Sequence, residues 1–496
     1  MGTVMISKCL AENLKQIQDS FSDCTDLVLI PWSYGSSFEH NALSVYFETM
    51  IQNEHLKYMK SAMEDLITYE AGSAEAVTPK AVMRFFKKHG ITGHSPKLLK
   101  DIDQVNEQIL SGAIVIFFDH WEEAISYAAS GLPFRQVSEP ITEPVVQGPH
   151  ISTIEELNVN IGIIRGLLKS AKLKFEYFTV GEISQRKIAY GYLDGAVNPE
   201  SLLEFKQKIA DIDTEEILET SYLEEWISDS VYSPFPQVRY TERPDTVVSA
   251  LLDGKIIVMV NGTPTILICP GIFFEFLASS EDYYQQTIFA SLIRILRFGA
   301  FVMALLLPSI YIALSTFHSE MIPTVLLLAI LDTREGIPFP AFVEALIMEV
   351  FFELLREAGI RLPRPIGSAV SIVGALVIGQ AAIQAKIASP VMVIVVALTG
   401  IASFTLPQYS MAISIRMLRF PLMILASTLG GLGIMFGLLL IFLHLVCLRS
   451  LGQPYFAPLG PLRINQLRDV FIVAPRKILL HQPRNRHLHK RKGGKT

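Results

Sequence analysis

The sequence predicts a cytoplasmic α/β N-terminal region of two similar lobes, followed by an α-helical polytopic membrane domain and a basic disordered tail. The first observation behind this prediction is composition. The 496-residue chain is 50% hydrophobic and only 18% charged, whereas about a quarter of the residues in soluble chains are charged. The second is charge distribution, with a net charge of −16 over Met1–Arg297, zero over Phe298–Leu448 and +10 over Arg449–Thr496. Such asymmetry indicates parts that meet different surroundings.

An internal repeat predicts the two lobes. Ile109–Ile116 reads ILSGAIVI and Leu251–Val258 reads LLDGKIIV, and Tyr46–Leu56 resembles Tyr192–Leu202 in the same order along the chain. Chance similarity between two strand–turn units is the alternative explanation, but two ordered matches at nearly one offset favour duplication. Asn-Gly at 261–262 between apolar runs predicts a hairpin. The expected parts are a first lobe over 1–132, a Pro-rich linker over 133–150 and a second lobe over 151–290.

The membrane domain is predicted over 291–450 from long apolar runs. A helix of about 20 apolar residues spans the hydrocarbon core of a bilayer. The predicted spans are 298–317, 366–385, 389–407 and 421–448. The segment 322–360 contains a shorter apolar run and a breaker stretch, so we expect it to be re-entrant or interfacial.

The number of crossings follows from the basic residues. Arg294 and Arg297 precede the first span and the basic tail over 451–496 follows the last, so both ends are expected in the cytoplasm. An even number of crossings satisfies this, and we expect four with a re-entrant excursion. Six crossings would need the last run to be split at Thr428–Gly433. The chain opens without a signal-peptide pattern, which also predicts a cytoplasmic N-terminal region.

No pattern of an enzyme is found in the sequence. It contains no phosphate-binding glycine loop, no HExxH and no GxSxG, and its four cysteines have no CxxC spacing. We therefore expect no catalytic residues, no cofactor and no metal site. The basic tail could attract nucleic acid, but its place after a membrane span favours anionic membrane lipid.

Glutamates within an apolar stretch are the first candidate site. Glu349, Glu353 and Glu357 are spaced four apart, so they stack on one face of a helix. Carboxylates are costly in hydrocarbon and need water or a cation beside them. The stretch is therefore either a cation pathway or an interfacial helix with a solvated acidic face.

Small residues in the later spans are the second candidate site. They permit close helix contact, and in an oligomer one face of the 366–385 helix could pack while another lines a pore. The candidate pore residues are Ser368, Ser371, Ala375 and Gln380. The candidate packing residues are Gly367, Gly374, Gly379, Gly430 and Gly433.

Three long motifs resemble one family. They are SPFPQVRYTERPD at Ser233–Asp245, LLDGKIIVMVNGTPTILICPG at Leu251–Gly271, and DTREGIPFPAFVEALIMEVFFELLREAGIRLPRPIGSAVSIVGALVIGQAAIQAKIASP at Asp332–Pro390. In this order they resemble the A subunits of GerA-type spore germinant receptors. The resemblance is strong over about 190–460 and weaker in the first lobe.

The resemblance implies a location and partners that composition and spacing do not. It implies an integral protein of the bacterial spore inner membrane, with its N-terminal region and tail facing the spore core. The implied partners are a transporter-like B subunit, a lipoprotein C subunit, further copies of the chain, membrane lipid and monovalent cations. The expected function is an oligomeric, nutrient-gated cation channel whose opening triggers germination. The alternative is an A-like accessory protein that modulates the dipicolinate channel and conducts nothing.

Overall fold

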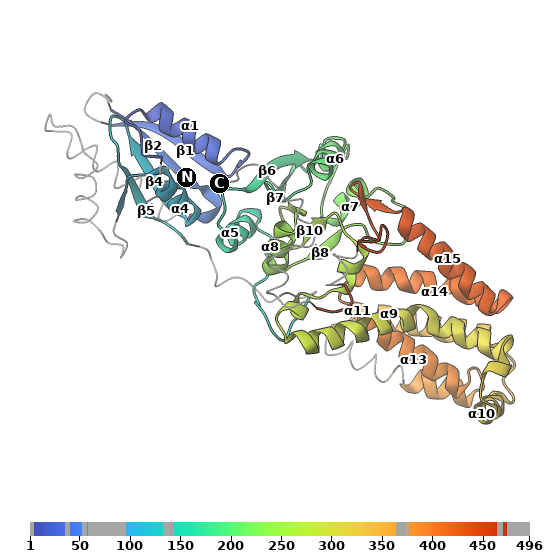
Figure 1. Cartoon of the computed structure of the whole chain (residues 1–496). Coiled ribbons are helices and arrows are strands. Elements are labelled where there is room, and N and C mark those ends of the chain that lie inside the picture. Colours follow the sequence, from blue (N-terminus) through green and yellow to red (C-terminus); the bar gives the residue numbers. More distant parts are fainter. Residues whose placement is uncertain are drawn as a thin grey trace. The chain divides into compact units, whose positions relative to one another are not determined.

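The chain forms two compact units. The computed structural model describes residues 4–34, 40–51, 57, 96–131, 140, 143–363, 374, 376–463 and 470–473. The first unit comprises the chain to Ile227 together with Tyr240–Pro270, and the second comprises Ser228–Arg239 and Gly271–Gln482. Sheets and short helices build the first unit, and long helices build the second (Figure 1).

The first lobe is an antiparallel five-stranded sheet. Its order is β1-β2-β4-β5-β3, and its register places Leu27 opposite Phe47 and Ala113 opposite Ala128. Every residue of the central strand β4 is buried, which explains its uninterrupted apolar sequence. The strands are β1 (Leu27–Tyr34), β2 (His40–Phe47), β3 (Lys97–Leu99), β4 (Ala113–Phe118) and β5 (Ala124–Ala128), with helices α1 (Leu10–Ser20) and α4 (Ile102–Leu110).

The second lobe repeats this strand order as β6-β7-β9-β10-β8. The Asn-Gly pair at 261–262 lies between the antiparallel strands β9 and β10, as its sequence predicts. The strands are β6 (Leu173–Val180), β7 (Arg186–Leu193), β8 (Arg239–Thr241), β9 (Ile256–Val260) and β10 (Ile266–Cys269). The helices are α5 (Leu157–Leu167), α6 (Pro199–Ala210), α7 (Ser221–Ile227) and α8 (Pro244–Leu252).

Two local structural features, a glycine turn and a buried asparagine, recur in both lobes. Gly112 follows α4 and Gly254 follows α8, with φ of +80° and +79°. A Cβ at Gly254 would lie 2.3 Å from the carbonyl oxygen of Ala196, so glycine is required there. Asn13 on α1 and Asn160 on α5 are both buried, and each exchanges two hydrogen bonds with the backbone six residues earlier. These asparagine hydrogen bonds leave no periodic pattern in the sequence, and sequence reasoning missed them.

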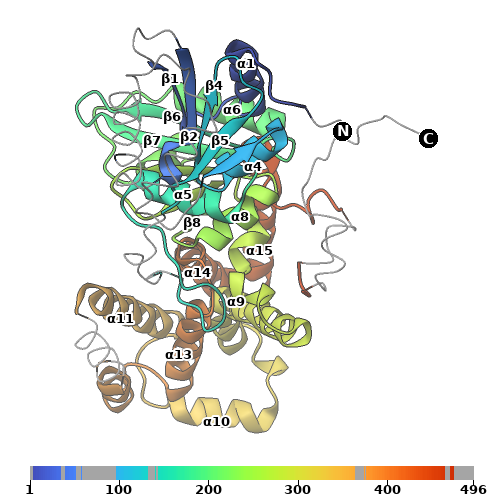
Figure 2. The same ribbon diagram turned by 90° about the vertical axis from the view of Figure 1, so that its left-hand side faces the viewer.

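The helical unit packs its long helices side by side. The helix α9 contacts α11, α13, α14 and α15, and Figure 2 shows α9, α13 and α14 from a second side. The helices are α9 (Thr287–Thr316), α10 (Thr324–Arg334), α11 (Ala341–Arg361), α13 (Pro390–Phe404), α14 (Tyr409–Leu429) and α15 (Gly431–Cys447). A short hairpin of β11 (Arg449–Ser450) and β12 (Gln453–Pro454) follows α15.

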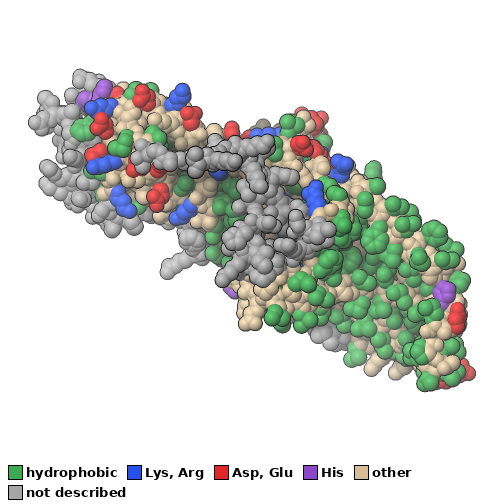
Figure 3. Space-filling model, viewed as in Figure 1, with side chains coloured by type: hydrophobic (Ala, Val, Ile, Leu, Met, Phe, Trp, Pro, Cys, Tyr) green, Lys and Arg blue, Asp and Glu red, His purple; other side chains and the backbone are tan. Residues whose placement is uncertain are grey.

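Some helices of this unit have the length and hydropathy of membrane spans. Within the described residues, α9 and α14 are long and apolar enough to cross a membrane, and α13 and α15 are shorter apolar helices. Figure 3 shows hydrophobic side chains covering the visible face of the helical unit. On α15, Met435, Phe436, Leu439 and Leu440 are all more than half exposed. Large apolar side chains that lie exposed together on one helix indicate a surface that meets lipid or another chain.

The expectation of one span over 421–448 is wrong, because the structure has two helices there. Gly430 adopts a φ of +61° between α14 and α15, which ends the first helix. The first of the two also begins earlier, at Tyr409. Arg416 and Arg419 interrupt the apolar run of this helix, so the hydropathy pattern does not reveal that the helix begins at Tyr409. The split is the one that six crossings would need.

The basic residues before the first span are not free surface charges. Arg294 and Arg297 are buried and share the carboxylate of Asp282, with nitrogen–oxygen distances of 3.1 and 3.0 Å. Arg297 also donates to the carbonyl oxygen of Leu277 at 2.9 Å. These ion pairs hold the start of α9 to the preceding segment. Arg294 and Arg297 are therefore weaker evidence for the orientation of this helix in a membrane. Half of the predicted linker over 133–150 lies outside the described residues, and the described part, 140 and 143–150, forms no helix or strand.

Candidate functional site

The glutamates predicted from sequence lie on α11 in the helical unit. Their side chains grade from fully buried Glu349 through Glu353, at 24% exposure, to Glu357 at 52%. One helical face therefore leads from the interior of the unit to its surface. A fourth glutamate, Glu344, is also fully buried, where it accepts from Arg334 Nη2 and from the backbone N–H of Ser389, each at 2.9 Å.

Glu349 forms a buried ion pair with Arg419 of α14. Arg419 Nη1 donates to the Glu349 carboxylate, and Arg419 Nε donates to the carbonyl oxygen of Ala304 on α9 at 3.0 Å. One guanidinium thus connects three helices. Within the described part of the chain, Glu349 Oε1 and Arg419 Nη2 are buried without a hydrogen-bond partner. A buried pair of this kind is held by its mutual charge, and loss of one partner leaves an uncompensated ion.

Glu353 lies between two arginines beside a cavity. Arg356 Nη2 donates to Glu353 Oε2 at 2.5 Å, and Arg416 Nη1 lies 3.8 Å from the same oxygen. The other oxygen, Glu353 Oε1, has no partner among the described residues. The cavity has a volume of about 520 Å³ and is lined by Glu353, Arg356, Glu357, Tyr409, Ile413, Arg416, Met417 and Phe420.

Arginines accompany every member of the predicted acidic stripe. Glu357 pairs with Arg361 at 2.6 Å, so each of the three carboxylates has a cationic neighbour on α11 or α14. The stripe therefore does not present three free negative charges. Sequence reasoning missed Arg416 and Arg419 as part of this site. The available signal was the presence of two arginines in a second apolar helix, which need acidic partners at membrane depth.

The candidate pore residues are described only in part. Ser368, Ser371 and Ala375 lie outside the described residues, as does Gly367 of the candidate packing set. Gln380 is exposed on a helical stretch over 376–384. The structure therefore describes one of the four candidate pore side chains, and that one is not buried against a neighbour.

Two glycines of the candidate packing set, Gly374 and Gly433, lie at close helix contacts. A Cβ on Gly374 would lie 2.7 Å from Leu355 Cδ2, and one on Gly433 would lie 2.0 Å from the carbonyl oxygen of Leu425. Gly379 has room for a Cβ, whose nearest neighbour would be 3.6 Å away. Gly430 ends a helix instead of packing within one. Sequence reasoning missed Gly400, where a Cβ would lie 2.2 Å from the Phe352 ring.

Comparison with known families identifies the chain. The sequence model described as Bacillus/Clostridium GerA spore germination protein matches residues 15–485. The chain belongs to the GerA family. The match spans the lobes, the glutamate helix and α13–α15, so the charged helical site lies within the GerA region.

Two relatives match this GerA protein over most of their length. It is 38% identical over 484 residues to the uncharacterized membrane protein YfkQ of Bacillus subtilis, covering 96% of this chain and 91% of that one. It is 39% identical over 472 residues to spore germination protein KA of Bacillus subtilis, covering 95% and 86%. A solved N-terminal domain of the A subunit of the Bacillus megaterium spore germinant receptor GerK3 aligns with a TM-score of 0.42 and 23% identity, covering 55% of this chain and 99% of that one.

Proposed function

We propose that this GerA-family protein is the membrane subunit of a nutrient-responsive spore germination receptor and forms an oligomeric cation channel whose opening triggers germination. Family membership over residues 15–485 supports the role in germination. In this proposal the protein lies in the spore inner membrane with its lobes and tail facing the core. It assembles with transporter-like B and lipoprotein C subunits, and nutrient binding to a partner shifts the channel from closed to open.

The buried charges of α11 and α14 are the observation that carries the channel part of the proposal. Ionisable side chains inside an apolar helical unit are costly, and they usually mark ion pathways. Glu353 is the member best suited to meet a cation, because one of its oxygens, beside the cavity of about 520 Å³, has no hydrogen-bond partner among the described residues. In this proposal the 366–385 helix forms the constriction, with Ser368, Ser371, Ala375 and Gln380 toward the pore, and gates by wetting.

A second candidate function is favoured by the same ion pairs. Glu349 pairs with Arg419, and Glu353 lies 3.8 Å from Arg416, and both arginines belong to α14. In this second function the ion pairs hold α11 against α14. An A-like accessory protein that modulates the dipicolinate channel and conducts nothing needs only such packing.

Ion flux separates the two functions. The full chain is reconstituted in liposomes, alone and with its B and C partners, and potassium release is recorded as candidate nutrients are added. The channel proposal expects nutrient- and partner-dependent release that Glu353→Gln lowers several-fold while assembly is unchanged. The matched control, Glu320→Gln, alters an exposed carboxylate of the helical unit that lies outside the glutamate helix and its cavity, and leaves release within about twofold. Absence of release from folded, inserted complexes would establish the accessory function instead.

A further inference from the structure

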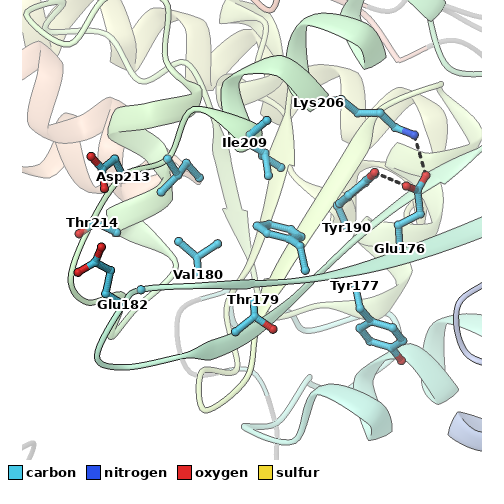
Figure 4. A pocket seen from close by; sticks show the side chains of 14 residues that line it. Glu176, Tyr177, Thr179, Val180, Glu182, Tyr190, Lys206, Ile209, Asp213 and Thr214 are labelled. Carbon is cyan, nitrogen blue, oxygen red and sulfur yellow. Dashed lines mark hydrogen bonds and ion pairs between the residues drawn. The ribbon is translucent and has the colours of Figure 1, made fainter.

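A groove follows strand β6 in the second lobe, far along the chain from the charged helices. It has a volume of about 640 Å³ and is lined by seven consecutive residues, Glu176 to Glu182, together with Tyr190, Lys206 and residues at the end of α6 and just after it. Figure 4 shows the α6 side chains facing the strand across this groove. A lining of consecutive strand residues is what an extended ligand lying beside the strand would contact.

The main chain of β6 is open along this groove. β6 is an edge strand of its sheet. The carbonyl oxygen of Phe175 points away from the sheet, since it accepts from the N–H of Thr25 at 3.0 Å. N–H and C=O groups alternate sides along a strand, so those of Tyr177 and Thr179 also point outward, and no described group bonds to them.

The open stretch has defined ends. Thr25 covers it at Phe175, and at the other end the N–H of Glu182 donates to the carbonyl oxygen of Thr214 at 3.2 Å. The six residues between Phe175 and Glu182 extend over about 20 Å at the usual rise of a strand. This length accommodates a short added strand that would satisfy the outward groups.

The side chains along the groove change character in order. At one end, Glu176 accepts from Tyr190 at 2.5 Å, from Lys206 at 2.9 Å and from Tyr192 at 3.0 Å, so Lys206 is already paired. Apolar side chains line the middle, and they are Phe178, Val180, Ile209 and Ile212. At the other end Glu182 and Asp213 are exposed (Figure 4). No described basic side chain forms an ion pair with either of them, so the groove carries an excess of negative charge.

We propose that this groove binds an extended polypeptide segment that carries an apolar side chain and a basic side chain, and that this segment adds to β6 as a strand. The main-chain groups of Tyr177 and Thr179 would pair with the segment. Its apolar side chain would lie against Val180 and Ile209, and a basic one would meet Glu182 and Asp213. The mode combines main-chain pairing for affinity with alternate side-chain pockets for specificity.

Peptide binding to the full chain tests this proposal. The probe is a fluorescent peptide with the sequence RNRHLHKRK, taken from residues 484–492, in which basic residues alternate around a leucine. The protein is held in nanodiscs of neutral phosphatidylcholine, so that the lipid does not attract the peptide, and anisotropy is measured. We expect saturable binding that the double variant Glu182→Gln, Asp213→Asn weakens at least tenfold. The matched control, Glu225→Gln on the exposed surface of α7, changes it less than twofold.

Strand addition has two separate tests. Thr179→Pro removes one outward N–H without removing a bond of the β6–β7 ladder, because proline is tolerated on the open side of an edge strand. A peptide methylated at alternate backbone nitrogens keeps its charges but loses donors, and needs no change to the protein. The proposal expects each to weaken binding at least tenfold. Equal binding of the methylated peptide would overturn it in favour of simple charge attraction, and absence of binding would overturn it outright.

Discussion

Arg165 of α5 and Asp26, just before β1, form a fully buried two-point ion pair between the lobes. Arg165 Nε donates to Asp26 Oδ2 at 2.5 Å and Nη2 donates to Oδ1 at 2.6 Å, although the residues are 139 positions apart. The guanidinium lies 4.0 Å from the centroid of the Phe47 ring and 5.1 Å from that of Phe175, so one ring from each lobe contacts it. Its planar fork and apolar faces make arginine suited to this position.

Loss of this pair should loosen the joint between the lobes. Asp26→Asn leaves the Arg165 charge buried without its partner, which costs about 3–5 kcal/mol. The Thr25 amide, which donates to Phe175 across the joint, should then exchange with deuterium about 100-fold faster or more. Arg165→Lys keeps the charge but loses the fork, so its effect should lie between wild type and Asp26→Asn. The control Asp23→Asn alters an exposed neighbour, and an equal effect there would contradict the assignment.

The Glu349–Arg419 pair should behave as a unit. Glu349→Met or Arg419→Met alone leaves one buried charge, which should lower the free energy of unfolding in mixed micelles by about 3–5 kcal/mol. The double variant removes both charges and should recover most of the loss, because apolar side chains replace the pair. Denaturant titration of the four proteins gives the coupling energy. Additive losses in the double variant would show that the two side chains do not stabilise the fold through each other.

Glu176 should make the second lobe sensitive to acid. Burial works to raise the pKa of Glu176, but hydrogen bonds from Tyr190, Lys206 and Tyr192 outweigh it, so this pKa lies below its usual value. A lowered pKa in the folded state contributes stability that is fully present above the unfolded pKa, about 4.3, and is lost as the pH falls through the folded value. Glu176→Gln should therefore destabilise the lobe at pH 7 by about 1.5–3 kcal/mol. The difference should shrink below about pH 4.3.

Thermal unfolding at pH 7 and pH 3.5 checks the prediction for Glu176. Glu225→Gln removes a carboxylate that is exposed on α7 and should give the same small change at both values of pH. A deficit in Glu176→Gln that persists undiminished at pH 3.5 would mean that its charge is not the source of the stability.

The cysteines should differ sharply in reactivity. Burial raises the pKa of Cys269 to about 12, so its thiolate is scarce at pH 8 as well as inaccessible. Cys9 is exposed. Iodoacetamide at pH 8 should label Cys9 within minutes and leave Cys269 unlabelled until the protein is denatured, as mass spectrometry of the peptides would record. Labelling of Cys269 in native protein at a rate near that of Cys9 would contradict the packing of β10.

Local patterns in the sequence predict much of the architecture. Three such patterns are the charge asymmetry, the apolar runs and the Asn-Gly pair. Each involves residues that are close together in the sequence, so the sequence alone reveals it. The glycines at 112 and 254 reveal matching turns for the same reason, because only a residue without a Cβ adopts a positive φ at no cost. The search for uncharged apolar runs missed the start of α14 at Tyr409, because Arg416 and Arg419 interrupt the run.

By itself, the sequence determined that an acidic α/β region precedes apolar helices, and that glutamates 349, 353 and 357 share a helical face. Only the tertiary structure decided that Arg419 neutralises Glu349, that Arg165 meets Asp26 and that β6 has an open edge. The physical reason is the separation along the chain between the residues that interact. Periodicity places a residue on a face of its own element, but the cost of a buried charge depends on side chains that reach it from distant parts of the chain.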